Sequence, residues 1–380
     1  MQDYIIEQNK IDVIVQDPTI KQNQEEFIIY KIQGQDRTGN FQIQRRFSEF
    51  YQLRLQLVEK WQYCYIPAIP EKAIQGNMTQ QFVYQRLQML NYFMRQLSHF
   101  QYLWYSQEVQ NFIRQPNIQE SNSNQQQKNY ADYLISIFPQ FAENPISQQN
   151  ETIIEQFFLF IQNATPILQN YKLIMKNQIN KSKNYFQQIN IFQNYFIPEY
   201  ETSLNENFEE LQFRSSSKLI FDVQKDFDLS DNEKQFYIMY TQIKIELNEF
   251  QVLNGVIQEK KQLYLEIQSL KKQLKKQVNY VSEIQNKGLN IIKKILITKD
   301  EEIELQLSKL KQFEKELTIK ISIYNLITNK LAIEIEFLKK IFSESYYCLV
   351  REMSQYFKKN AQDNISFYQN LLQQIENQGL

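Results

Sequence analysis

The chain has 380 residues, and its 42 lysines and arginines nearly balance 43 aspartates and glutamates, for a formal net charge of −1. A chain of this length is long enough for two domains. It has no run of about 20 apolar residues and no N-terminal apolar stretch with a cleavage site, which excludes a membrane-spanning helix and a secretory leader. We therefore expect a soluble, cytoplasmic protein.

Residue types that carry catalysis or bind metals are sparse. Cys64 and Cys348 lie far apart, without a CxxC spacing or a histidine neighbour, so we expect reduced thiols and no metal site. His99 is the only histidine, and we expect it to cap or pack against a helix. No glycine-rich phosphate loop and no nucleophile motif is present, so the sequence predicts neither an enzyme nor a cofactor.

The N-terminal third opens with three short β-branched or aromatic runs, at residues 11–15, 27–32 and 41–44. Turn formers between Gly34 and Asn40 separate the last two runs, which is typical of a hairpin. Apolar residues then recur at helical spacing from Ser48 and again from Thr79. The sequence predicts an α+β domain with a three-stranded antiparallel sheet and helices.

The segment Arg45-Arg46-Phe47-Ser48-Glu49-Phe50 lies where this β-rich opening becomes helical, and Ile66-Pro67-Ala68-Ile69-Pro70-Glu71-Lys72 follows it. An arginine can grip a phosphate in two places, and an aromatic ring can stack on an inositol. A lysine on a proline-stiffened loop can meet a second phosphate. These residue types favour recognition of a phosphorylated lipid headgroup, although the arginines are also compatible with an ordinary solvated surface.

The order of these features resembles the phox-homology (PX) domain, over residues 1–116. The resemblance implies that Arg46 binds the 3-phosphate of phosphatidylinositol 3-phosphate, that Phe47 stacks on the inositol ring and that Ser48 assists at the 3-phosphate. It also implies that Lys72 contacts the 1-phosphate and that Arg86, on the helix from Thr79, holds the ring hydroxyls.

A polar linker is expected at residues 117–150, because no apolar period survives in the Asn- and Gln-rich stretch 117–127. Beyond it, glycines are few and helical periodicity is long. The sequence predicts three long helices, near 166–213, 231–294 and 299–376. The last carries coiled-coil spacing at Ile303, Leu307, Leu310, Leu317, Ile321, Tyr324, Leu331, Ile335, Leu338, Phe342, Leu349 and Tyr356.

A helix of that length would measure on the order of 110 Å, too long to be buried in one globule, so it must pack along partners. Three long helices after a PX domain resemble the BAR domain of the PX-BAR sorting nexins, here over residues 151–380. The resemblance implies a dimeric coiled-coil crescent on curved early endosome membranes, with retromer-like or other coat and cargo proteins as candidate partners. Homodimer and heterodimer both remain open.

Lysines concentrate between Lys260 and Lys299, where ten lysines stand against two glutamates, a local net charge of +8. We call this range the basic zone. We expect it to contact anionic lipids through Lys271, Lys272, Lys275, Lys276, Lys293 and Lys294. A solvated helix face is the alternative. Nucleic acid is not expected as a partner, because aromatic residues for base stacking are not interleaved with these lysines.

The apolar run at residues 151–161 lies where the PX-BAR sorting nexins carry an amphipathic linker helix. It lacks the cationic polar face usual for interfacial helices, so insertion into the membrane and packing between the two domains remain equally open. Residues 130–138 are a competing candidate.

Together these features predict a non-catalytic peripheral membrane protein that recognises phosphatidylinositol 3-phosphate on endosomes and senses or induces membrane tubulation in protein sorting. The alternative is a coiled-coil scaffold that recruits protein partners to endosomal or autophagic membranes, with the PX domain serving only as an address tag.

Overall fold

The computed structural model describes residues 11–22, 26–72, 79–116, 130–191, 195, 198–200, 202–203, 229–287 and 299–377. The chain forms two compact units. The first comprises Met1–Glu71, Leu90–Asn163 and Asn248–Lys339, and the second comprises Lys72–Met89, Ala164–Leu247 and Lys340–Leu380. Each unit is therefore assembled from segments that lie far apart in the sequence.

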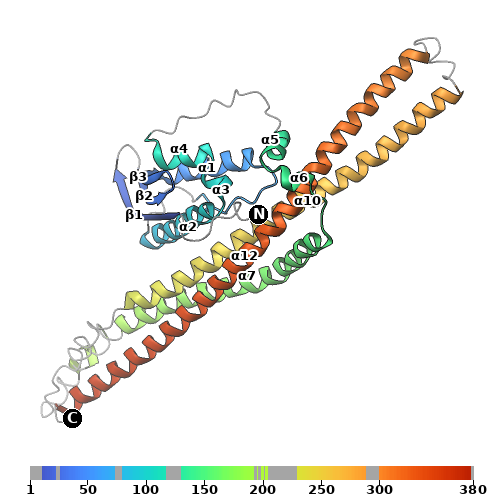
Figure 1. Ribbon diagram of the computed structural model, residues 1–380. Helices are drawn as coiled ribbons and strands as arrows, with labels where there is room; N and C mark the ends of the chain where they lie inside the picture. Colours follow the sequence, from blue (N-terminus) through green and yellow to red (C-terminus); the bar gives the residue numbers. More distant parts are fainter. Residues whose placement is uncertain are drawn as a thin grey trace. The chain divides into compact units, whose positions relative to one another are not determined.

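The predicted three-stranded antiparallel sheet is confirmed. Strands β1 (Asp12–Gln22), β2 (Glu26–Asp36) and β3 (Gly39–Arg46) pair in the order β1-β2-β3 (Figure 1). The β1–β2 register shifts between Gln16 and Thr19, where Pro18 has no N–H to donate to the ladder.

Two glycines shape the β2–β3 hairpin. Gly39, which pairs with Asp36 across the turn, has φ +112°, a conformation that other residues rarely adopt. Gly34 pairs with Phe41, and a Cβ added there would lie 2.0 Å from the Asp12 carbonyl oxygen and 2.8 Å from Cζ of Phe41. Only glycine fits at Gly34 without displacing a neighbouring strand.

Four helices follow the sheet: α1 (Phe47–Lys60), α2 (Gln80–His99), α3 (Gln101–Trp104) and α4 (Gln107–Arg114). In the first unit, Phe50 of α1 lies with its ring edge-on to Tyr30 of β2 and 4.9 Å from the Phe112 ring of α4, centroid to centroid. All three side chains are almost completely buried. They join the sheet, α1 and α4 around one aromatic core.

Two short helices, α5 (Tyr130–Ile137) and α6 (Pro139–Glu143), lie within the range predicted as a polar linker. Leu134, Phe138 and Phe141 are buried, so this part of the range is folded rather than extended. The Asn- and Gln-rich stretch 117–127 lies outside the described residues. The limits of the two domains and the linker stay predictions.

The three predicted long helices are confirmed as α7 (Gln148–Ile191), α10 (Leu229–Lys287) and α12 (Lys299–Asn377). The predicted start of the first at residue 166 was wrong. Residues 151–161 belong to α7 because Ile154, Phe157 and Ile161 continue its buried face, and the helix runs through Pro166. Residues 204–213, at the predicted end of this helix, lie outside the described part.

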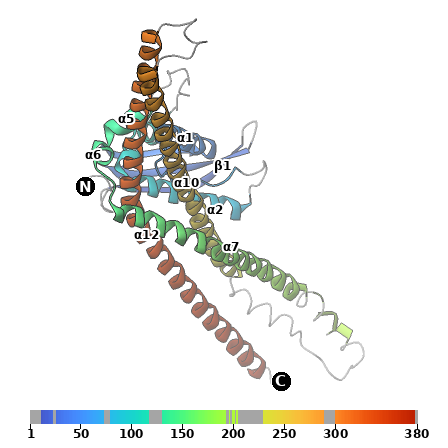
Figure 2. The same ribbon diagram turned by 90° about the vertical axis from the view of Figure 1, so that its right-hand side faces the viewer.

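Apolar contacts join the long helices within each unit. In the first, α10 and α12 run side by side through Leu263, Ile267, Ile323 and Ile327 (Figures 1 and 2). In the second, all three long helices share one core, made by Met175, Ile179, Phe236, Met239, Ile243, Leu349 and Tyr356. Among the described helices, none combines the length and the apolar character needed to cross a membrane.

Candidate anion-binding site

The two arginines at the end of β3 point to opposite sides of the sheet, because neighbouring strand residues alternate. Arg45 is 2% exposed and lies on the core side. Its guanidinium donates hydrogen bonds to the carbonyl oxygens of Phe112 (2.9 Å), Pro116 (3.1 Å) and Gln115, and to Glu49 Oε1 (3.2 Å). Arg45 therefore fastens the carboxyl end of α4 to the sheet.

Arg46 is exposed, and its guanidinium carbon lies 3.4 Å from the centroid of the Phe27 ring. Its backbone N–H donates to Glu49 Oε2 at 2.7 Å, and the other oxygen of that carboxylate faces Arg45. The guanidinium of Arg46 makes no hydrogen bond or ion pair with a described side chain. Its donors face solvent while stacking on Phe27 limits its motion, which suits the capture of an anion.

Phe47 and Ser48 form the first turn of α1, directly after Arg46. Ser48 is exposed, and the half-buried Phe47 ring lies 6.4 Å from the Tyr51 ring. The amino end of a helix carries a positive potential and backbone N–H groups that favour anions. The structure therefore brings together an arginine, a ring and a hydroxyl at a helix start.

The other two predicted ligands, Lys72 and Arg86, belong to the second compact unit. Lys72 is exposed at the end of the loop after α1, and Arg86 is half-buried on α2, with its guanidinium 4.3 Å from the Phe82 ring centroid. A single site that combines these two with Arg46 stays a prediction.

The loop at residues 61–71, between α1 and Lys72, is held by groups that our sequence reasoning missed. Arg54 of α1 donates from Nε to the Pro67 carbonyl oxygen at 2.9 Å. The Ala68 N–H donates to Oε1 of Glu249 on α10 at 2.8 Å, and the Tyr65 hydroxyl donates to Oε2. Burial raises the pKa of Glu249 to about 7 and raises the pKa of Tyr65, which also faces that carboxylate. These contacts could not be predicted from the sequence, because no local pattern indicates that Glu249 lies against residues about 180 positions earlier in the chain.

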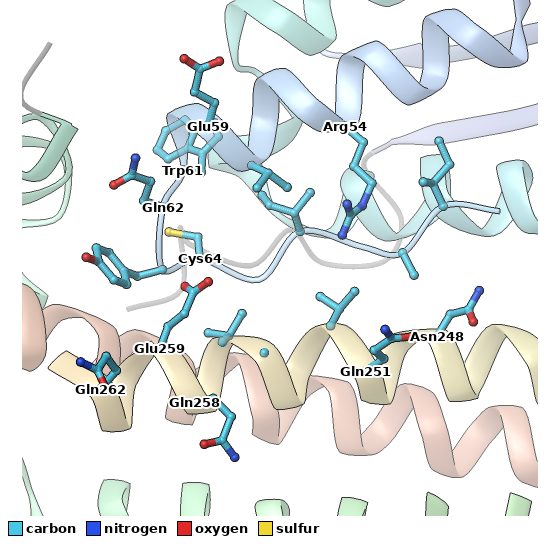
Figure 3. Close-up of a pocket in the computed structure, with 18 of the residues that line it drawn as sticks. Arg54, Glu59, Trp61, Gln62, Cys64, Asn248, Gln251, Gln258, Glu259 and Gln262 are labelled. Carbon is cyan, nitrogen blue, oxygen red and sulfur yellow. The ribbon is translucent and has the colours of Figure 1, made fainter. Parts of the chain in front are cut away.

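A cavity of about 1160 Å³ separates part of this loop from α10 (Figure 3). Its apolar lining includes Val58, Trp61, Ile66, Val252, Val256 and Leu263. Glu59, Glu71 and Glu259 also line it, together with Arg54. Desolvation raises the pKa of Glu259. Beside the cavity, Tyr65, Ile66 and Pro67 of the loop are buried, whereas Ala68 is half-buried.

The basic zone is less uniform than its sequence suggests. Lys271, Lys272, Lys275 and Lys276 are exposed on α10, whereas Lys293 and Lys294 lie outside the described residues. Lys260 is buried, with Nζ 2.6 Å from Glu151 Oε2 and 3.1 Å from the Tyr324 hydroxyl. Lys261 lies 3.4 Å from the Phe158 ring centroid. Lys260 therefore connects α10 to α7 and α12, and lipid contact by the six predicted lysines stays a prediction.

The run 151–161 divides between two faces of α7. Ile154, Phe157 and Ile161 are buried in the first unit, while Leu159 and Phe160 are more than 40% exposed. The competing stretch 130–138 is likewise divided, with Leu134 and Phe138 buried. Membrane insertion of either stretch stays a prediction.

Cys64 and His99 are packed into the first unit, whereas Cys348 is half-buried in the second. Burial raises the pKa of Cys64 to about 11, and burial lowers the pKa of His99, whose ring lies 5.2 Å from that of Phe337, to about 4. Within the described ranges, no group of three or more histidines, cysteines or acids is placed to hold a metal ion.

Comparison with known proteins agrees with this architecture. The family model for the PX domain matches residues 34–116. The cryo-EM structure of the SNX-BAR Mvp1 tetramer is 14% identical, covers 95% of this chain and 99% of that chain, and superposes with a TM-score of 0.57. The X-ray structure of a designed CISK-PX domain is 22% identical and covers 27% of this chain and 97% of that chain, with a TM-score of 0.25. No curated protein sequence matches the chain.

Proposed function

We propose that this chain, which carries a PX domain within the fold of an SNX-BAR sorting nexin, is a non-catalytic peripheral membrane protein of early endosomes. It binds phosphatidylinositol 3-phosphate through the PX domain. As a dimer of its long helices, it senses or induces membrane curvature in endosomal protein sorting.

The exposed guanidinium of Arg46 is the observation that supports this proposal most directly. Of the two arginines at the end of β3, Arg45 donates its hydrogen bonds to backbone carbonyl oxygens of the domain. The guanidinium of Arg46 instead faces solvent beside Phe47 and Ser48. A charged fork at a helix start supports recognition of a phosphate on a ring. Lys72 then binds the 1-phosphate and Arg86 the ring hydroxyls.

Exposed apolar residues on the long helices support the dimer. In the second unit these side chains include Ile167, Leu173, Ile174, Tyr346, Tyr347, Val350 and Phe357. Large exposed apolar side chains on helices already packed around a core favour burial against another chain. A second copy or a related chain meets this requirement, and coat or cargo proteins would bind in addition.

The decisive experiment is flotation of the full chain with vesicles that contain or lack a few per cent of phosphatidylinositol 3-phosphate, with imaging of the bound vesicles. We expect binding that requires the lipid and converts vesicles to tubules. Arg46→Ala should weaken the lipid-dependent binding about 30-fold, because loss of charge-assisted hydrogen bonds costs roughly 2 kcal/mol. Its thermal unfolding should match that of the original chain.

Arg37→Ala is the matched control. Arg37 is also exposed, in the turn between β2 and β3, where its guanidinium carbon lies 3.7 Å from the Tyr105 ring centroid. This variant should bind as the original chain does. Lipid selectivity retained by Arg46→Ala would refute the site, and binding without any change of vesicle shape would favour the scaffold alternative.

A further inference from the structure

A carboxylate of the helical region lies buried against the loop that leads to Lys72. Glu249 of α10 is 0% exposed, and its two oxygens accept hydrogen bonds from different residues of that loop, Tyr65 and Ala68. Arg54 of α1 donates to the carbonyl oxygen of Pro67, between these two residues. Three of the four loop residues from Tyr65 to Ala68 are thus fixed by hydrogen bonds to α10 or α1.

Burying a carboxylate costs free energy that its hydrogen bonds only partly return. An apolar side chain of similar volume would avoid that cost, but it would leave the Tyr65 hydroxyl and the Ala68 N–H without their acceptor. The carboxylate is therefore the group that holds these two donors, and with them one conformation of the loop.

The polar contacts of Glu249 act together with apolar packing, because Tyr65, Ile66 and Pro67 of this loop are buried. The cavity of about 1160 Å³ opens between the loop and α10, beside Arg54 and Ala68 (Figure 3). Ala68, beside the cavity, is only half-buried, and the hydrogen bond from its N–H to Glu249 links this part of the loop to α10. The two acceptor oxygens of Glu249 thereby fix the distance of Tyr65 and Ala68 from α10.

We propose that Glu249 is a positioning residue of the headgroup site: by holding Tyr65 and Ala68, it places the following segment so that Lys72 is presented to the lipid phosphate. Lys72 is four residues beyond Ala68, so its Cα lies within about 14 Å of this anchor. Pro67 and Pro70 restrict the intervening backbone. This inference rests on the proposed function, since it assumes that Lys72 contacts phosphate.

Such an arrangement links the helical region to lipid binding. If α10 stabilises the binding conformation of the loop, lipid binding must in turn stabilise the contact between Glu249 and the loop, because linkage is reciprocal. Headgroup binding should therefore slow amide hydrogen exchange at Ala68, whose N–H donates to Glu249.

The test is a double-mutant cycle in the full chain, with vesicle binding measured at a fixed content of phosphatidylinositol 3-phosphate. Glu249→Leu replaces both acceptor oxygens by an apolar side chain of similar volume. Lys72→Ala removes the proposed phosphate contact. Each single change should weaken binding about tenfold. The double variant should bind little more weakly than Lys72→Ala alone. If Glu249 acts only by positioning Lys72, its substitution has no further effect on binding once that lysine is gone.

Losses that multiply in the double variant, or a Glu249→Leu variant that binds as the original chain does, would overturn the inference. Tyr65→Phe provides a milder version, since it deletes only one hydroxyl from a buried ring. It should show a smaller loss with the same dependence on Lys72, even if Glu249→Leu impairs folding.

Glu246→Leu is the matched control. Glu246 lies one helical turn earlier on α10, where desolvation raises the pKa of its carboxyl to about 7, as it does for Glu249. Its substitution should leave lipid binding unchanged. If Arg46→Ala binds as the original chain does, the proposed function itself fails. If Arg46→Ala loses lipid binding but the losses from Glu249→Leu and Lys72→Ala multiply in the double variant, only the role of Glu249 is refuted.

Discussion

Arg45 and Arg46 are the same residue type in adjacent positions, yet the fold gives them different roles. The strand directs Arg45 to the core side, where carbonyl oxygens of α4 and the residues after it surround it, and directs Arg46 to solvent. Glu49 completes the arrangement by accepting from the Arg45 side chain and the Arg46 backbone. The motif therefore combines a structural arginine with the arginine that is proposed to bind the headgroup.

Arg45→Ala should destabilise the protein by about 3 kcal/mol, because it leaves the buried Phe112 carbonyl oxygen without its donor and breaks a partly buried ion pair with Glu49. Denaturant unfolding, followed by tryptophan fluorescence, measures this cost. Arg46→Ala should change the unfolding midpoint by no more than a surface substitution does. Equal stabilities for the two variants would contradict the assigned roles.

Elements of this chain are specified by their local patterns, but their limits and spacing depend on neighbours. The β-branched runs mark the strands, and the close approach of β1 and Phe41 to Gly34 explains why a glycine interrupts β2. The start of α7 shows the opposite situation. Its first turns were missed because their apolar residues were interpreted as a separate segment, and only the packing of Ile154 and Phe157 joins them to the helix.

Gly34→Ala should cost about 2 to 4 kcal/mol of folding free energy, because its Cβ would overlap the Asp12 carbonyl oxygen and force β1 from β2. Gly255→Ala on α10 is the control, since a Cβ there meets nothing within 4 Å. That change should be neutral or stabilising by up to about 1 kcal/mol, through improved helix propensity. Similar denaturation midpoints for both variants would argue against close strand packing at Gly34.

At the scale of the whole molecule, membrane binding is expected to combine headgroup recognition with charge on the long helices. A dimer would carry two PX domains and two basic zones, and their linkage raises the overall affinity without new contacts. The exposed lysines of α10 are the described part of that charge, whereas Lys260 belongs to the packing between helices.

Changing Lys271, Lys272, Lys275 and Lys276 together to glutamine should weaken binding to anionic vesicles that lack phosphatidylinositol 3-phosphate, by at most about 1 kcal/mol for each lysine. The loss should shrink as salt rises, because screening removes the same attraction. Sedimentation with vesicles over a salt series measures both effects. Four exposed lysines of the second unit, changed likewise, serve as the control: Lys176, Lys181, Lys340 and Lys358. Equal losses from both sets would indicate non-specific charge rather than a basic zone.

The sequence by itself determined the order of strands and helices, the PX resemblance and the three long helices, because alternation and helical periodicity are local properties of the chain. It also placed the candidate ligands Arg46, Phe47 and Ser48 in one short segment. Only the tertiary structure decided that Arg45 supports α4, that Lys260 is buried and that Glu249 holds the loop before Lys72. These roles arise from contacts between residues about 65 to 180 positions apart, whose partners are defined only once the elements pack.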